Sequence, residues 1–204
     1  MTTDFANLPA DITPSVFFAA IAEALKDEPA PANAAPDKLL LHVTGDEGGT
    51  WAMGFVNGRL AIDQSAADKP PLQVTTSIED FRAFLAGSVR DALKAKAGSK
   101  ASAIDAKQVA KLFRITTKTD QVKQYTGDLQ LVVEDSPSNH KLTLTFGGTT
   151  PNPAKPTTTI SISLADFLAL TGGELNAQAA FFAGKIRLDG DMNLAMGLMA
   201  MAMG

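Results

Sequence analysis

The residues best suited to catalysis or metal binding are two histidines and several glycine-rich turns. His42 and His140 lie far apart in the sequence, without a second histidine four residues away or a carboxylate at ligand spacing, so we predict no metal site. The runs "GDEGG", "FGG" and "TGG" do not continue into the Lys-Ser/Thr of a phosphate loop, and the chain has no Gly-x-Ser-x-Gly motif. We therefore expect no catalytic residue, no enzyme activity and no cofactor.

Acidic side chains occur at positions that favour helix capping over acid-base chemistry. Ser77 precedes Asp80 by three residues, and Ser163 precedes Asp166 by three, which is the spacing of a capping box. In the "DGD" turn at 189–191, Asp191 is placed to cap a final helix, and the motif is too short for a calcium loop. We interpret both histidines as structural or solvated.

Composition excludes several classes of partner. The chain has 204 residues, of which 45% are hydrophobic, and its net charge of −4 argues against a nucleic-acid surface. It has no cysteine, so a thiolate site is excluded and a reducing compartment is allowed. The N-terminal stretch has no basic region followed by an apolar run, so we expect a cytoplasmic location. The densest basic stretch, Lys94 to Lys111, suits a solvated face, or alternatively a weak attraction to anionic membrane surfaces.

The most unusual feature is the apolar C-terminus, "DMNLAMGLMAMAMG". Thirteen helical residues rise only about 20 Å, which is too short to cross a bilayer core of roughly 30 Å. As a helix this segment is apolar nearly all round, so it needs burial on more than one side: against its own sheet, and also against the other repeat, a partner chain or a lipid. Methionine at helical spacing is most often ordinary core, although its unbranched, polarisable side chain also suits a wall that accepts variable ligands.

The first half contains two predicted helices and four predicted strands. Apolar spacing predicts a helix over 14–25, with Pro14 in its first turn. The runs "KLLLHVT", "TWAMGFV" and "GRLAIDQ", separated by "GDEGG" and "NG", predict an antiparallel meander. The run "LQVTTS" predicts a fourth strand that leads directly into one long helix over 78–97.

The second half repeats this order. A linker "GSKAS" and a helix in "DAKQVAKLFRI" are followed by the strands "GDLQLVVED", "HKLTLTFGG" and "TTTISIS" and by the helix "LADFLALT". A shift of 86 residues places "SIEDFRAFLAG" on "SLADFLALTGG" with five identities in eleven. We interpret the chain as two related repeats, an incomplete one over 14–100 and a more complete one over 104–204. The second alone adds a short helix, a strand "KIRLD" and the final helix.

The stretch "ADFLALTGGELNAQAAFFAGKIRLDGDMNLAMGL" resembles the C-terminal signature of the sterol carrier protein 2 family. The residues that carry this resemblance are Asp166, Phe167, Phe181, Phe182, Gly184, Lys185 and Gly190, continued by Leu194, Ala195 and Met196. Trp51, followed by Asn57 and Gly58, is similar to the second and third strands of the family. Ala177 and Ala183 stand where typical members carry proline and a polar residue, which implies a more apolar wall.

The resemblance implies an α+β fold, in which a mainly antiparallel sheet is covered by helices on one face around an apolar tunnel. The implied function is non-catalytic binding and carrying of a lipid: a fatty acid, an acyl chain or a sterol-like molecule. The expected lipid-binding wall comprises Phe146, Ile160, Ile162, Phe167, Leu170, Phe181, Phe182, Ile186, Leu188, Met192, Met196 and Met199. The alternative is a structural module whose groove is filled by its own side chains and whose methionine-rich helix is an interface.

Overall fold

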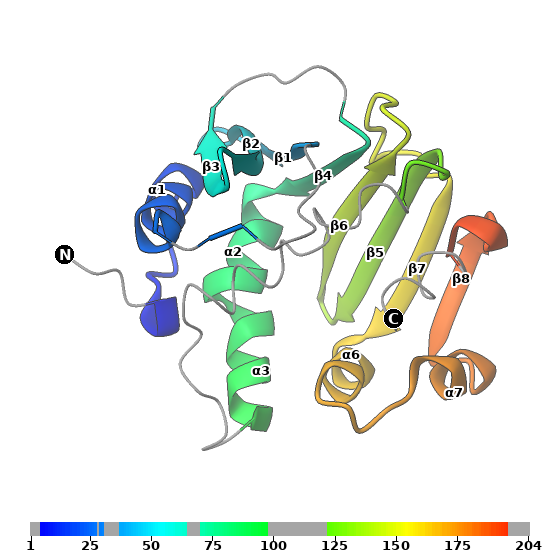
Figure 1. Cartoon of the computed structure of the whole chain (residues 1–204). Helices are drawn as coiled ribbons and strands as arrows, with labels where there is room; N and C mark the ends of the chain where they lie inside the picture. The colour runs from blue at the N-terminus through cyan, green and yellow to red at the C-terminus, as the bar shows by residue number, and fades with distance from the viewer. Residues whose placement is uncertain (1–4, 28, 31–36, 65–69, 98–121, 196–204) are drawn as a thin grey trace.

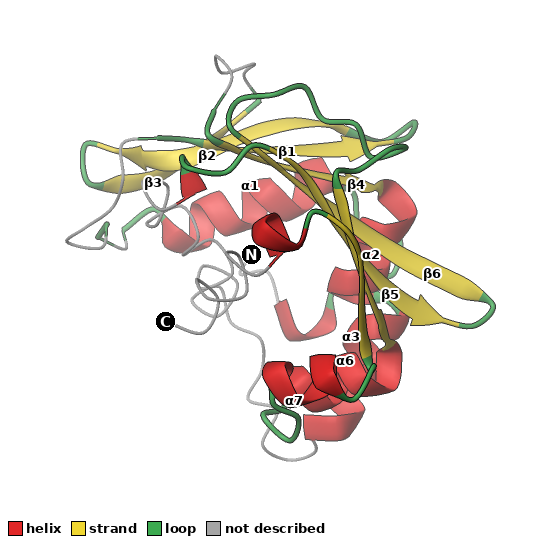
Figure 2. Cartoon of the chain, turned by 90° about the vertical axis from the view of Figure 1, so that its right-hand side faces the viewer, coloured by secondary structure: helices red, strands yellow, loops and turns green. Residues whose placement is uncertain are grey.

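A computed structural model of the chain describes residues 5–27, 29–30, 37–64, 70–97 and 122–195 (Figure 1). These residues form an α+β fold in which one eight-stranded sheet carries its helices on a single face (Figure 2). The fold class agrees with the sequence prediction. The linker "GSKAS", the helix predicted in "DAKQVAKLFRI" and two predicted wall residues, Met196 and Met199, lie outside the described residues.

The sheet runs across both halves of the chain in the order β3-β2-β1-β4-β6-β5-β7-β8. The strands are β1 (Leu39–Thr44), β2 (Gly49–Val56), β3 (Arg59–Asp63), β4 (Leu72–Ser77), β5 (Gly127–Asp135), β6 (Ser138–Phe146), β7 (Thr158–Ser163) and β8 (Ile186–Gly190). All eight were predicted from alternation and turn residues. The sheet is mixed, because β4 pairs in parallel with β1 and β7 pairs in parallel with β5, while the other described pairs are antiparallel.

The two halves share a local topology. In each, an antiparallel hairpin (β1-β2 or β5-β6) is followed by a strand that pairs in parallel with the hairpin's first strand, and that strand leads into a capped helix. Antiparallel pairing of β4 with β6 joins the halves. The second strand of each hairpin has one further neighbour, which is β3 for β2 and β4 for β6. The parallel strand of each half also has one further neighbour, which is β6 for β4 and β8 for β7. Duplication of an ancestral unit stays a prediction.

The helices begin where the sequence supplies caps. They are the 3-10 turn η1 (Phe5–Asn7), α1 (Pro14–Leu25), α2 (Ile78–Ala86), α3 (Ser88–Ala97), α6 (Leu164–Thr171) and α7 (Ala177–Phe182). The hydroxyls of Ser77 and Ser163 accept hydrogen bonds from the backbone N–H groups of Asp80 and Asp166, which confirms both predicted caps. Asp191 likewise accepts from the N–H of Asn193 at 2.8 Å. No described helix has the length and apolar character needed to cross a membrane.

The prediction of one continuous helix over 78–97 was wrong. Gly87 adopts an extended conformation with φ −120° and ψ −149°, so the chain leaves the helix there and α3 starts afresh. The N–H of Asp91 donates to the carbonyl of Gly87 at 2.9 Å, which opens the new hydrogen-bond ladder. Glycine permits this break because, without a Cβ, its backbone adopts non-helical angles at little cost. The result is two shorter helices, of which α2 packs against the central strands β1, β4 and β6 and α3 continues beyond it (Figure 1).

The main hydrophobic cluster draws on both halves. On α1, Phe17 and Phe18 are each 2% exposed, and the Phe18 ring lies 5.0 Å from that of Trp51 on β2. Phe146 at the end of β6 is fully buried in the same cluster and pairs across the junction with Leu72 on β4. The first half therefore shares a core with the second instead of folding on its own.

We expect substitution of Phe146 by alanine to weaken the whole chain. Loss of a buried phenylalanine costs about 3–5 kcal/mol of unfolding free energy. Because one cluster joins the halves, the Trp51 fluorescence transition in urea should fall in midpoint together with the far-UV circular dichroism transition. The control Val56→Ala, at a side chain 47% exposed on β2, should change stability by less than about 0.5 kcal/mol. An unchanged Trp51 transition in Phe146→Ala would show that the halves unfold independently.

Candidate functional site

An aliphatic row crosses the helix-side face of β6, β5, β7 and β8. Leu142 pairs with Leu131, Leu131 pairs with Ile160, and Ile160 pairs with Leu188, so the four side chains stand in register on one face. All four are only partly buried. With strands about 4.8 Å apart, the row is roughly 14 Å long. We call these four residues the aliphatic row.

Buried side chains flank the aliphatic row on both sides. Toward one end of the strands, Leu129 and Phe146 belong to the main cluster, 5% and 0% exposed. Toward the other end, Val133, Ile162 and Ile186 form a small cluster, exposed by 0%, 2% and 6%. Ile160 packs against both clusters. The aliphatic row is thus a partly covered strip of the sheet between two fully packed clusters.

The helices over this part of the sheet cover it loosely. The helix α6 carries apolar residues at helical spacing, yet none of its residues is fully buried. Phe167 and Leu170 are partly buried against the small cluster, as is Phe181 of α7, in which only Ala180 is buried. By contrast, five residues of α1 are buried over the first half. The second half therefore presents half-exposed apolar surface on both its sheet and its helices.

The structure separates the predicted wall residues into three groups. Phe146, Ile162 and Ile186 are fully packed core, whereas Ile160, Phe167, Leu170, Phe181 and Leu188 are half-buried around the aliphatic row. Phe182 and Met192 are surface residues, 78% and 55% exposed. Phe182 turns outward because consecutive helical positions face different sides, and Phe181 takes the inner one.

Sequence reasoning missed two residues of the aliphatic row. Leu131 and Leu142 stand in "LQLVVED" and "HKLTLTF", where apolar and polar residues alternate. That alternation identifies which side chains share a face, and pairing each hairpin strand by its two-residue turn would have placed the two leucines opposite each other. The alternation within the two strands therefore indicates both leucines, whereas the C-terminal signature does not include them.

An ion pair fixes the start of α6 against β8. The Lys185 ammonium, just before β8, donates to Asp166 at 2.5 Å, and the Ser163 hydroxyl donates to the same carboxylate at 2.9 Å. These two hydrogen bonds, the one from Lys185 first, lower the pKa of the Asp166 carboxyl below its usual value. Asp166 therefore supports the Ser163 cap and holds the start of α6 beside the strand at the edge of the sheet.

Gly190 sets the exit from β8 beside the same wall. Its φ of +106° lies in the left-handed region, and a Cβ at this position would lie 2.2 Å from the carbonyl oxygen of Thr157. Only glycine fits both conditions. The chain then turns at Asp191 toward Leu194, which is 4% exposed in the main cluster. The Gly-Asp pair thus returns the chain to the helix side of the sheet.

His140 lies within the hairpin that β5 and β6 form. It belongs to β6, is 9% exposed, and pairs with Val133. Its Nδ1 lies 3.2 Å from Asp80 Oδ1, while its Nε2 lies 3.3 Å from Ser88 Oγ and 3.7 Å from Asp135 Oδ2. Asp80 and Ser88 come from α2 and α3, so the cluster attaches the helices of the first half to the sheet of the second. We assign it to this structural role.

The opposite face of the sheet is polar. His42 bonds with Thr50 at 3.0 Å and Gln73 at 3.2 Å, and Gln73 donates to the carbonyl of Thr149 at 2.7 Å. Asp128, 6% exposed, accepts from the Asn152 N–H and so helps to hold the loop that follows β6. Among the described residues no group of three or more metal-ligating side chains comes together. The aliphatic row and both hydrophobic clusters around it lie on the helix side of the sheet.

Comparison with known proteins identifies the C-terminal half. Residues 106–203 match the SCP-2 sterol transfer family. Over these residues the chain is similar to that family. The match includes the described signature residues on α6, α7 and β8. The first half lies outside the match, so only the second of the two expected repeats carries this similarity.

Individual relatives agree over short segments. Human "Sterol carrier protein 2" is 38% identical over 84 residues, which is 38% of this chain and 15% of the human protein. "Peroxisomal multifunctional enzyme A" of Dictyostelium discoideum is 46% identical over 50 residues, 24% of this chain and 11% of that protein, a likeness at the level of one domain. The solution structure of sterol carrier protein domain 2 from Helicoverpa armigera has 28% identity and a TM-score of 0.34, covering 51% of this chain and 91% of that one.

The Asp166 ion pair makes stability depend on acid pH. Since its folded-state pKa is lowered, the carboxylate stabilises the fold above its unfolded pKa, near 3.9, and this contribution is lost as pH falls through the folded pKa. We expect Asp166→Asn to lower the urea midpoint at pH 7, with a difference from wild type that shrinks on acidification. Asp189→Asn, at an exposed carboxylate on β8, is the matched control. Equal effects of the two substitutions at pH 7 would contradict the role of this pair.

Proposed function

We propose that the second half of the chain binds and carries a long apolar molecule, such as a fatty acid, another acyl chain or a sterol-like lipid. The observation that carries this proposal is the aliphatic row, four in-register side chains that remain partly exposed between two filled clusters. Burial of apolar surface contributes about 25 cal/mol per Å², so a ligand laid along this floor gains affinity in proportion to its length. The similarity of residues 106–203 to the SCP-2 sterol transfer family supports the same ligand class.

Binding would bury the ligand between the sheet and α6 with α7. Phe167, Leu170 and Phe181 supply half-buried apolar surface from the helices, opposite Ile160 and Leu188 on the sheet. These side chains are uncharged, so the wall selects for apolar area over any particular head group. No covalent step is needed, and the carrier releases its ligand unchanged.

The alternative, a structural module with a self-filled groove, describes the first half better than the second. There the α1 phenylalanines Phe17 and Phe18 pack against Phe81 and Trp51 with ring centroids 5.0–6.0 Å apart. Around Phe81, the helix-side face is filled by the chain's own rings. For the second half, whose row stays partly exposed, lipid binding is the favoured function.

A polar substitution in the aliphatic row tests the proposal. Ile160→Thr keeps a β-branched side chain suited to a strand but places a hydroxyl in the ligand wall, where an unpaired hydroxyl costs about 1–3 kcal/mol. We expect the Kd for a fluorescent long-chain fatty acid to rise about tenfold or more. Binding is measured by fluorescence titration of the full chain, and Trp51 emission verifies that the variant is folded.

The matched control is Val56→Thr, the same kind of change at an exposed position on β2 in the first half. It should leave the Kd unchanged. An unaltered Kd in folded Ile160→Thr would place the ligand elsewhere, and failure of the wild type to bind any long-chain probe would favour the self-filled module.

A further inference from the structure

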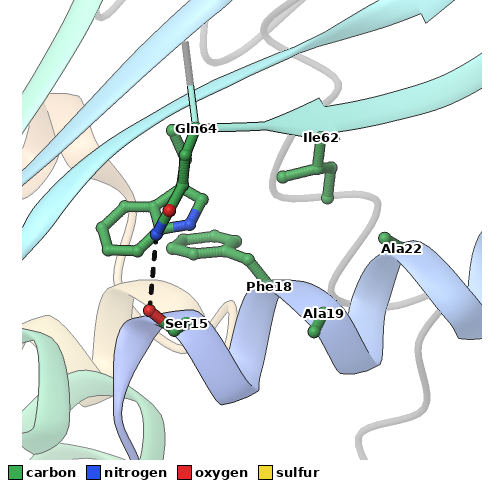
Figure 3. Close-up of a pocket in the computed structure, with 7 residues that line it drawn as sticks. Ser15, Phe18, Ala19, Ala22, Ile62 and Gln64 are labelled. Carbon is green, nitrogen blue, oxygen red and sulfur yellow. Dashed lines mark hydrogen bonds between the residues drawn. The ribbon is translucent and has the colours of Figure 1, made fainter.

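The first half contains a cavity of its own, separate from the aliphatic row. It measures about 310 Å³ and lies between α1 and the strands β2 and β3 (Figure 3). These strands form one edge of the sheet, while β7 and β8 form the other. The cavity therefore lies outside the segment that matches the family, and its occupant need not be a long-chain lipid.

The cavity exists because α1 presents small side chains toward β3. Ser15, Ala19 and Ala22 are spaced by four and three residues, so they share one face of the helix, and all three line the cavity. Figure 3 shows this helix face opposite Ile62 of β3. Side chains this short do not fill the space between helix and strand. Larger residues of α1, including Phe17 and Ile21, are instead turned into the core.

Two aromatic rings supply the inner wall. Phe18 and Trp51 both line the cavity and are themselves 2% and 3% exposed. Their ring centroids are 5.0 Å apart, with an interplanar angle of 35°. With so little exposed surface, the two rings form a packed base beneath the cavity. The wall is rigid because both rings also belong to the main cluster.

The described lining of the cavity includes two polar side chains. Gln64 Nε2 donates to Ser15 Oγ at 3.5 Å, which is long for a hydrogen bond (Figure 3). The Ser15 hydroxyl can still donate, and the Gln64 amide can accept through its carbonyl oxygen. Among the described residues that line the cavity, none is acidic or basic. A charged ligand would lose its hydration here without gaining an opposite charge.

We propose that this cavity binds a small, uncharged ring compound that bears one hydroxyl or carbonyl group. The ring would lie over Ala19, Ala22 and Ile62, above the buried rings of Phe18 and Trp51, and the polar group would bond with Ser15 or Gln64. A volume of about 310 Å³ is at the lower end of the range for ligand pockets, which suits a compound with a single ring. This proposal is independent of the lipid site in the second half.

Trp51 provides a direct readout, because it is the only tryptophan in the chain. Its indole N–H gives a single side-chain cross-peak in the proton–nitrogen NMR spectrum of the full-length protein. Benzyl alcohol and benzoate serve as a matched pair of probes, since they share a ring and differ in charge. We expect benzyl alcohol to shift this peak saturably, and benzoate to bind about tenfold more weakly or not at all.

Two substitutions locate the effect. Ala22→Phe places a ring in the cavity and should abolish the saturable shift, whereas Val16→Phe, at a side chain 59% exposed on the same helix, should leave it unchanged. If Ala22→Phe does not fold, Ala19→Phe at an exposed lining position replaces it. The proposal is overturned if benzyl alcohol gives no saturable shift, if benzoate binds equally well, or if the shift persists in a folded cavity-filling variant.

Discussion

The antiparallel pairing of β4 with β6 is the constraint on which the rest of the structure depends. Each half supplies a hairpin and a parallel third strand, but without the other half β4 and β6 would each have one unpaired edge. By pairing Leu72 with Phe146, the two halves close each other's open strand edge and become one twisted sheet. Because both halves meet in the same orientation, all their helices fall on one face and one apolar core forms beneath.

The two halves differ in how completely their helices cover the apolar face of the sheet. The first half places α1 over its edge strands and packs its aromatic side chains inside. The second half has the short helices α6 and α7, which meet the sheet near one end of the strands and leave the aliphatic row half-exposed. The first half thus acts as a scaffold, and the uncovered apolar floor of the second half is where a carried lipid would gain most from burial.

Polar contacts fix this arrangement at its edges. Asp80 and Asp166 occupy corresponding capping positions but take different partners: His140 on β6 for the first and Lys185 before β8 for the second. In both cases the carboxylate contacts the strand next to the one that leads into its helix. Asp80 follows β4 and contacts β6, and Asp166 follows β7 and contacts Lys185, just before β8. Each helix is therefore fixed at its N-terminus relative to the sheet. This anchoring keeps α6 beside the aliphatic row without requiring its apolar side chains to be buried.

Much of this architecture could be predicted from local sequence signals. Alternation and turn residues gave all eight strands, and the serine caps gave the starts of α2 and α6. The break at Gly87 was missed because glycine is tolerated within helical patterns, and only tertiary packing decides whether the helix continues. The aliphatic row and the His140 cluster were missed for a different reason. They depend on which strands become neighbours, and the β4-β6 pairing between distant segments leaves no mark in either segment alone.

The most direct test is amide hydrogen exchange of the full chain, measured by mass spectrometry with and without a saturating long-chain fatty acid. If the ligand lies on the aliphatic row, exchange should slow in α6, α7, β7 and β8 and remain unchanged in β1 to β3, because only the former gain cover. Protection confined to the first half, or no protection despite bound ligand, would contradict the assignment of lipid carrying to the second half.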